Sequence, residues 1–365
     1  MRKLLLVSVI AIAGILFYVA NRHHDESVGV SATAPTGAGE KLNASAVLKI
    51  DLARPTTVPA ARAPRVAPSP FTQVYNDRKD WPGLYKQLKA ASPTAETQYL
   101  LAQLLTACAK RPTAVPPAGS PVRPPDTREE RRARFMASLS PKDPQLEKRK
   151  TAYDAANGDN CGDIAQVDFD AAEVQKLYEA AAAAGDPRAR AVQIARQIED
   201  EARALSSAGQ PGPNPRMGAY PISDAQFATI RELLGSQDPA VMAELKGILS
   251  STLVDGSIRL GPNQETVDNM AFHQAWGLVA CEFGARCDKT SPEMLAQCAS
   301  NGHCDADNLY DQTYYYGTSP YAAQLVERYR QQLAQMIASG DFSQLNLARG
   351  PNDPGRMFVF GRRGR

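Results

Sequence analysis

CEFGARC at residues 281–287 and CASNGHC at residues 298–304 contain four of the chain's six cysteines. Each segment begins and ends with a cysteine, and a short helical stretch separates the two. They lie just before the apolar stripe of the last long helix, so they predict a disulfide-stapled cap at the end of a helical fold. The other two cysteines are Cys108, which ends the run YLLAQLLTA, and Cys161, in the turn GDNCG.

An even set of cysteines in an exported chain is typical of disulfides, and six cysteines allow 15 pairings. The most economical assignment pairs Cys108 with Cys161 across a proline-rich segment. Closing this long loop would stabilise the fold by about 3 to 4 kcal/mol in the chain-entropy description. The other four then pair among themselves: Cys281, Cys287, Cys298 and Cys304.

Residues 1–24 have the pattern of an export signal that stays attached as an anchor. Arg2 and Lys3 precede an apolar run from Leu4 to Ala20, which is near the lower limit for spanning a bilayer. The bulky Tyr18 occupies a position where a cleavage site needs a small residue, and no cysteine follows the run to make a lipoprotein. The basic N-terminus stays in the cytoplasm. We therefore expect a single-pass bacterial inner-membrane protein with its bulk in the periplasm; cleavage and export is the alternative.

Proline-rich segments divide the rest of the chain. Residues 25–70 are rich in Ala, Thr, Pro and Gly, a composition that cannot bury enough apolar surface to offset its ordering entropy, so we expect a flexible linker. Residues 71–345 then form the helical domain, with proline-rich insertions near 111–126 and 206–221. Residues 346–365 are expected to be a basic flexible tail.

The domain's apolar residues recur at helical spacing, and no stretch alternates convincingly at the period of a strand. The fold class is therefore all-α, with almost no sheet: an irregular α-solenoid or a helical bundle of helix-turn-helix pairs, stapled by disulfides. Gly185 and Gly235 provide left-handed helix stops. Helix starts are predicted where a capping side chain precedes a proline, about fifty residues apart in the central part: Ser92-Pro93, Asp186-Pro187, Asp238-Pro239, Ser291-Pro292 and Ser319-Pro320.

The segment Leu177–Ala191 contains AAAAAGDPRARA after a Leu-Tyr-Glu start. It resembles the helix-turn-helix core of Sel1-like repeats, relatives of the tetratricopeptide class. In that family the glycine marks the turn and small residues permit close helix packing. The match is good for this one repeat and poor elsewhere, because the units are longer than the family's and proline-rich insertions interrupt them. The resemblance implies an α-solenoid that serves as a protein-binding scaffold.

The sequence contains no motif for metal, cofactor or nucleophilic chemistry, and we expect neither metal nor cofactor. His303 beside Cys304 could complete a thiol and imidazole set, but the cysteine spacing does not fit zinc. His273 lies on an apparent apolar helix and is expected to be a satisfied, semi-buried histidine. The alternative that remains is glycoside hydrolysis by helix carboxylates, for which the candidates lie near one another in sequence: Glu265, Asp268 and Glu282.

The run Tyr314-Tyr315-Tyr316 is the candidate contact surface, although burial against the last helix would explain it equally well. Elsewhere, the cluster REERRAR at residues 128–134 interleaves both signs of charge and is expected to be a solvated helix face. The net charge of the chain is only +2, so no global field favours nucleic acid.

These features together predict a membrane-anchored periplasmic scaffold without catalytic activity, which binds a protein partner in the periplasm or cell envelope and contacts the inner membrane through its anchor. Two alternatives stay open. One is a peptidoglycan hydrolase that uses helix carboxylates. The other is an anchored folding helper for a secreted protein, a class that shares the layout of anchor, Ala/Pro tether and helices; the Arg-x-x-Phe-Asp-Tyr motif of lipase foldases is absent here.

Overall fold

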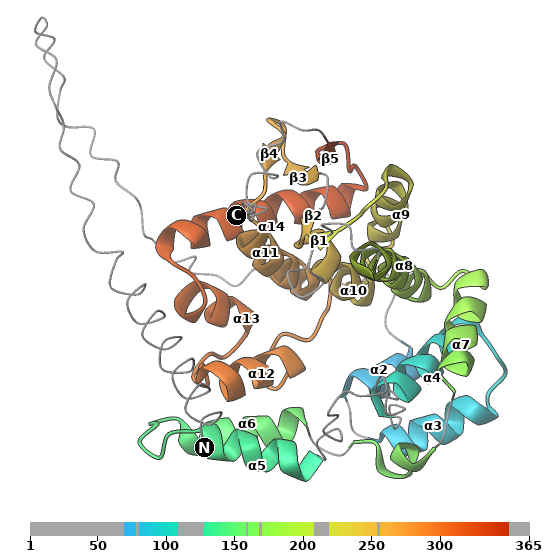
Figure 1. Ribbon diagram of the computed structural model, residues 1–365, viewed down its shortest axis with the longest axis vertical. Helices are drawn as coiled ribbons and strands as arrows, with labels where there is room; N and C mark the ends of the chain where they lie inside the picture. The colour runs from blue at the N-terminus through green and yellow to red at the C-terminus, as the bar shows by residue number, and fades with distance from the viewer. Residues whose placement is uncertain are drawn as a thin grey trace, which may run out of the picture. The chain divides into compact units, whose positions relative to one another are not determined.

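The computed structural model describes residues 69–77, 80–108, 128–157, 160–167, 170–207, 219–253 and 256–349 (Figure 1). The predicted signal-anchor, nearly all of the first linker and the insertion at 111–126 lie outside these residues, as do most of the insertion near 206–221 and the tail from residue 350. Within the described ranges, no helix has both the length and the apolar character needed to cross a bilayer.

The described residues are mostly helical, as the sequence predicts. The helices are α2 (Pro70–Asp77), α3 (Trp81–Ala90), α4 (Ala95–Cys108), α5 (Arg128–Ser138), α6 (Leu146–Ala156), η1 (Gly162–Gln166), α7 (Ala171–Ala183), α8 (Pro187–Ser207), α9 (Asp224–Leu234), α10 (Pro239–Leu249), α11 (Asn269–Glu282), α12 (Pro292–Asn301), α13 (Leu309–Asp311), η3 (Gln312–Tyr316) and α14 (Pro320–Ser339). The strands are β1 (Ala219–Tyr220), β2 (Thr252–Leu253), β3 (Gly256–Leu260), β4 (Glu265–Thr266) and β5 (Leu345–Arg349).

Two large hydrophobic clusters organise most of these helices, and α8 contributes to both. The helices α5 and α6 pack against α12 in a third, smaller cluster. The first cluster is formed by α3, α4, η1 and α7, and includes Ala189 and Val192 of α8. The second is larger and is formed by α9, α10, α11 and α14, together with Ile194 and Ile198 of α8. The two pairs of α8 residues lie about half a turn apart around the helix axis, so this one helix presents an apolar face to each cluster.

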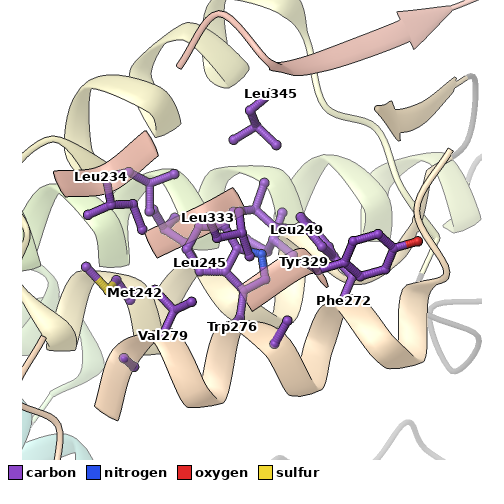
Figure 2. Packing of buried hydrophobic residues seen from close by; sticks show 14 of the residues in the cluster. Leu234, Met242, Leu245, Leu249, Phe272, Trp276, Val279, Tyr329, Leu333 and Leu345 are labelled. Carbon is purple, nitrogen blue, oxygen red and sulfur yellow. The ribbon is translucent and has the colours of Figure 1, made fainter. Parts of the chain in front are cut away.

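Figure 2 shows the centre of the larger cluster, where α11 and α14 lie side by side. Trp276 is 1% exposed and Phe272 is fully buried. The Phe272 ring meets the Trp276 ring edge-on at a centroid distance of 5.8 Å and the Tyr329 ring at 5.9 Å. Leu345 of β5 also belongs to this cluster, so the C-terminal strand covers part of the core.

The helix starts follow the predicted capping residues. The carboxylates of Asp186 and Asp238 each accept a hydrogen bond from a backbone N–H two residues on, at 2.8 Å in both cases. Ser291 and Ser319 accept from an N–H three residues on, with proline at the first helical position. These side chains satisfy donors that the first helical turn leaves unpaired.

Two local predictions are wrong. Ser92 does not cap α4, which starts at Ala95, and the hydroxyl of Thr94 accepts instead from the N–H of Thr97 at 3.2 Å. Gly235 is right-handed (φ −63), and Gln237 takes the left-handed conformation (φ 59). Gly185 is left-handed, as expected (φ 91).

The expectation of almost no sheet needs correction, because two small sheets are present in the described residues. β1 pairs with β2 in parallel, and β4, β3 and β5 form an antiparallel sheet in that order. The predicted flexible tail starts too early, since residues 346–349 are part of β5. Leu345 and Leu347 lie on either side of the polar Asn346, which is the alternation of a strand. The Leu345 side chain is fully buried.

All six cysteines form disulfides. The bond between Cys108 and Cys161 spans 53 residues, and it is the pairing favoured by the sequence. The four C-terminal cysteines form two bonds that each span six residues. We call residues 298–304, closed by the last of these bonds, the C-terminal ring.

Candidate functional site

The tyrosine run 314–316 lies on η3, a π-helix that directly continues α13. Asn308 starts the segment by accepting a hydrogen bond from the N–H of Asp311 at 3.0 Å. Gly317 ends it by donating its N–H to the carbonyl of Gln312 at 2.8 Å, which is the five-residue hydrogen bond of a π-helix. Such turns are rare and are found frequently at functional sites.

The three tyrosines lie in different environments. Tyr314 points inward: its hydroxyl donates to Oε2 of Glu327 at 2.6 Å, and its ring packs against the larger cluster. Burial, and then the neighbouring carboxylate, raise the pKa of Tyr314 well above its ordinary value. Tyr315 and Tyr316 are 43% and 44% exposed. Tyr315 and Tyr316 are therefore accessible to a partner, as the predicted contact surface requires. Tyr314 instead follows the alternative, burial against the last helix.

Two further large apolar side chains, Met270 and Tyr321, are exposed by 72% and 71%. Met270 lies one helical turn before Gln274, whose side-chain amide donates to the carbonyl of Gly317 at 3.3 Å. Tyr321 is in the first turn of α14, four residues after Gly317. Among the described residues, the exposed large apolar side chains thus belong to segments that meet near Gly317. We call Met270, Tyr315, Tyr316 and Tyr321 the tyrosine surface.

A buried ionic network supports this surface from within. The Arg330 guanidinium, on α14, contacts the carboxylate of Glu282 on α11 and donates its Nε–H to Glu327 at 2.8 Å. Burial alone would raise the pKa of Glu327, but hydrogen bonds from Arg330 and Tyr314 outweigh it and hold this pKa at about 2. Because Tyr314 is part of the network, one hydrogen bond joins η3 to α14.

The carboxylates considered for hydrolysis have separate structural roles. Glu265 pairs with Arg328 at 3.1 Å. Asp268 caps α11 by accepting from the N–H of Ala271 at 2.8 Å. Glu282 is buried against Arg330. Each of the three is therefore engaged by a different partner.

His273 lies beside Ser250, with 2.7 Å between its Nδ1 and the serine Oγ. The same Oγ is 2.6 Å from the carbonyl oxygen of Lys246, which can only accept. The hydroxyl proton is therefore assigned to the carbonyl, and His Nδ1–H donates to the serine. Desolvation of the ring and then the Lys246 charge lower the pKa of His273 to about 4, so the ring is neutral at pH 7. His273 is therefore satisfied, as expected, but its side chain is exposed and not semi-buried, because it lies on the outer face of α11. The arrangement leaves the serine without a base.

Sequence reasoning missed Met270 and Tyr321 as surface residues. Met270 precedes Val279 by nine residues, which is two and a half helical turns, so it lies on the face opposite the buried Val279. An apolar residue on the polar side of a helix is the signal that could have identified it. The pairing of His303 with Tyr316, whose rings stack with centroids 5.3 Å apart, left no signal in the sequence because it joins separate segments.

No protein family, curated protein or solved structure matches this chain. The helix-turn-helix that resembles a Sel1-like repeat corresponds to α7, α8 and the left-handed Gly185 between them. Ala181 and Ala189 are fully buried there, as close packing of two helices requires. Membership of that family stays a prediction.

Proposed function

We propose that this protein is a membrane-anchored scaffold of the periplasm that binds a protein partner through the tyrosine surface. The observation that carries the proposal is the gathering of exposed apolar side chains near Gly317. Soluble domains seldom expose neighbouring large apolar side chains without a binding role. Tyrosine is also enriched in protein interfaces, because its ring gives contact area and its hydroxyl stays hydrogen-bonded.

The rest of the chain fits a scaffold. The helix pairs are consistent with an irregular solenoid or bundle, and the α7–α8 pair with the Sel1-like resemblance. The sequence of residues 1–24 supports attachment to the inner membrane, and the proline-rich residues that follow would hold the helical domain away from it. The net charge of +2 gives no support for a nucleic-acid partner.

The two alternatives have less support. Hydrolysis needs two carboxylates that face one substrate, and Glu265, Asp268 and Glu282 are each held by a structural partner. A folding helper would also bind a protein, so it differs from the scaffold in the identity of the partner. An activity assay on purified peptidoglycan separates the hydrolase from both.

The direct test is crosslinking in cells followed by purification of the full-length chain. Wild-type protein should recover one predominant partner. The double variant Tyr315→Ser/Tyr321→Ser should recover at least about tenfold less, because tyrosine is enriched among the interface hot spots, whose truncation costs about 2 kcal/mol or more. The matched control is Lys86→Ser/Lys176→Ser, which alters two exposed positions on α3 and α7. Equal recovery by both double variants would contradict the proposal.

A further inference from the structure

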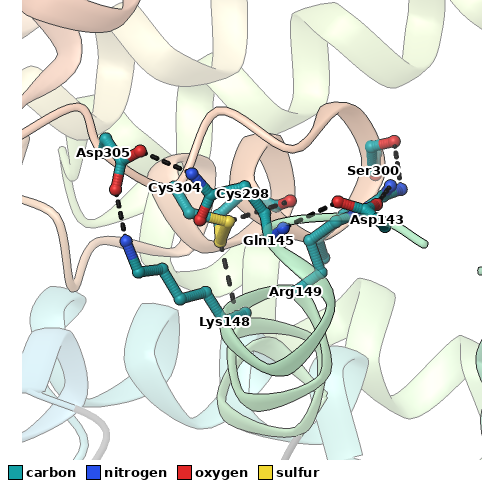
Figure 3. Close-up of a disulfide and its surroundings, with 9 residues drawn as sticks. Asp143, Gln145, Lys148, Arg149, Cys298, Ser300, Cys304 and Asp305 are labelled. Atoms are coloured by element: carbon teal, nitrogen blue, oxygen red, sulfur yellow. Dashed lines mark hydrogen bonds and ion pairs between the residues drawn. A yellow bond between two sulfur atoms is a disulfide. The ribbon is translucent and has the colours of Figure 1, made fainter. Parts of the chain in front are cut away.

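The C-terminal ring touches two separate parts of the fold. It contacts the helix pair α5–α6, and through His303 it contacts the tyrosine surface. Figure 3 shows the first of these contacts, with the Cys298–Cys304 disulfide beside Lys148 and Arg149 of α6.

Polar contacts hold α6 to the ring. Arg149 donates from Nε to the carbonyl of Ala299 at 2.8 Å and from a terminal nitrogen to that of Ser300 at 2.9 Å (Figure 3). These carbonyls belong to the last turn of α12, where a cation also offsets the helix dipole. Lys148 pairs with Asp305, the residue that follows the ring.

The apolar part of this contact is small and includes the disulfide itself. Its buried members are Ala152 of α6 with Cys298 and Ala299 of α12, and Cys304 packs against them. Phe135 and Tyr153 stack at 4.1 Å and complete the cluster. Leu295, which precedes the ring on α12, also packs against this cluster. The bonded sulfurs are therefore a large share of the apolar contact between α6 and α12.

The second contact of the ring is made by His303. Its imidazole stacks on Tyr316 at a centroid distance of 5.3 Å, and its Nδ1 is buried without a hydrogen-bond partner in the described structure. The ring thus supports the tyrosine surface at Tyr316. Gly302, left-handed at φ 75, makes the turn that delivers His303 to Tyr316.

We propose that the Cys298–Cys304 disulfide is a redox switch that couples the α5–α6 pair to the tyrosine surface; as a means of controlling partner binding, it rests on the proposed function. The closed ring holds α6 and Tyr316 in place together. The open ring releases both, because Arg149 loses its ordered carbonyls and His303 loses its fixed position.

The chemistry needs a dithiol reductant of the thioredoxin class. One thiolate of the dithiol attacks Sγ of Cys304, which is more exposed than Cys298, and forms a mixed disulfide. The S–S bond breaks, and Cys298 leaves as a thiolate that takes a proton from water. The second thiol of the dithiol then displaces Cys304 and closes its own disulfide. Two electrons pass to the ring, and the dithiol is oxidised.

Hydrogen exchange followed by mass spectrometry tests the coupling on the full chain without any partner. In the variant Cys298→Ser/Cys304→Ser, peptides covering residues 128–157 and 309–319 should both exchange at least ~10-fold faster than in wild type, as locally unfolded segments do. Arg149→Ala should affect only the first peptide, and His303→Ala only the second. These single variants keep the disulfide. They show that each peptide's exchange rate reports on its own contact with the ring.

The matched control is Cys281→Ser/Cys287→Ser, because that bond also joins cysteines six residues apart but has no contact with α6 among the bonds described. It should leave the exchange rate of residues 128–157 at the wild-type value.

If the Cys298/Cys304 variant fails to fold, wild-type protein treated with graded dithiothreitol replaces it, and alkylation mapping reports which cysteines are reduced. The exchange rates of both peptides must then rise in step with alkylation of Cys298 and Cys304. Either peptide staying at its native rate in the open-ring state would overturn the switch. Failure of crosslinking at the tyrosines would instead overturn the proposed function and leave this exchange result intact.

Discussion

Arg330 and Arg328 are two residues apart on α14 but lie in opposite environments. Arg330 is nearly buried and bonds to the buried Glu282, whereas Arg328 and its partner Glu265 are each about half exposed. A buried ion pair contributes little beyond an apolar pair of the same shape, but removal of one partner leaves an uncompensated charge. At the surface, water replaces the lost partner.

We therefore expect Arg330→Met to lower the free energy of unfolding by about 3 to 5 kcal/mol. The matched variant Arg328→Met should cost no more than about 1 kcal/mol. Urea unfolding followed by circular dichroism measures both. Equal losses for the two variants would show that the network does not stabilise α14 against α11.

Glu327 makes stability depend on pH at the acid end. Its pKa is about 2 in the folded protein against 4.5 for the ordinary carboxyl, so the folded state favours the charged form. Its contribution is complete above about pH 4.5 and is lost as the pH falls toward 2. Glu327→Gln should show a flatter decline of unfolding free energy between pH 5 and pH 2, measured by urea titration. Parallel declines in wild type and variant would contradict this assignment.

Among the helices and strands, the sequence predicts helix starts, which depend on neighbouring residues. It does not predict pairing between segments that are far apart in the chain. Asp238 and Ser319 identify helix starts because the cap and the donors that it satisfies lie within one turn. β5 depends on β3, some ninety residues earlier, and its short Leu-Asn-Leu alternation is too brief to predict a strand alone. The inward position of Tyr314 likewise depends on a contact with Glu327, which lies on another helix.

Gly256 tests the pairing of β3 with β5. A side chain at Gly256 would collide with the backbone carbonyl of Ala348, whereas one at Gly247, on α10, would meet open space. Gly256→Ala should therefore destabilise the fold and expose the C-terminal strand to limited proteolysis. Gly247→Ala should be neutral or stabilising by up to about 1 kcal/mol, because it only raises helix propensity. Similar proteolysis patterns for the two variants would argue against a strand at residues 345–349.

In the complete chain, an expected anchor precedes a helical domain that contains three disulfides. The pairing of all six cysteines is typical of an oxidising compartment, as the expected export predicts. We expect the chain to fractionate with membranes, to retain residues 1–24 in its intact mass, and to show no free thiols when denatured under alkylation. Deletion of residues 2–24 should leave a protein in the cytoplasm with reduced cysteines. Six reactive thiols in the full-length chain would refute both the disulfides and the expected export.

The proposed binding of a protein partner by the tyrosine surface can be tested directly by site-specific photocrosslinking. A photoreactive residue is placed in cells at Tyr321 or, as the control, at the exposed Ala228 on α9. We expect a discrete adduct of one partner from position 321, lost when Tyr315→Ser is added, and none from position 228. Adducts of equal yield at both positions, or none at position 321, would contradict the proposed binding.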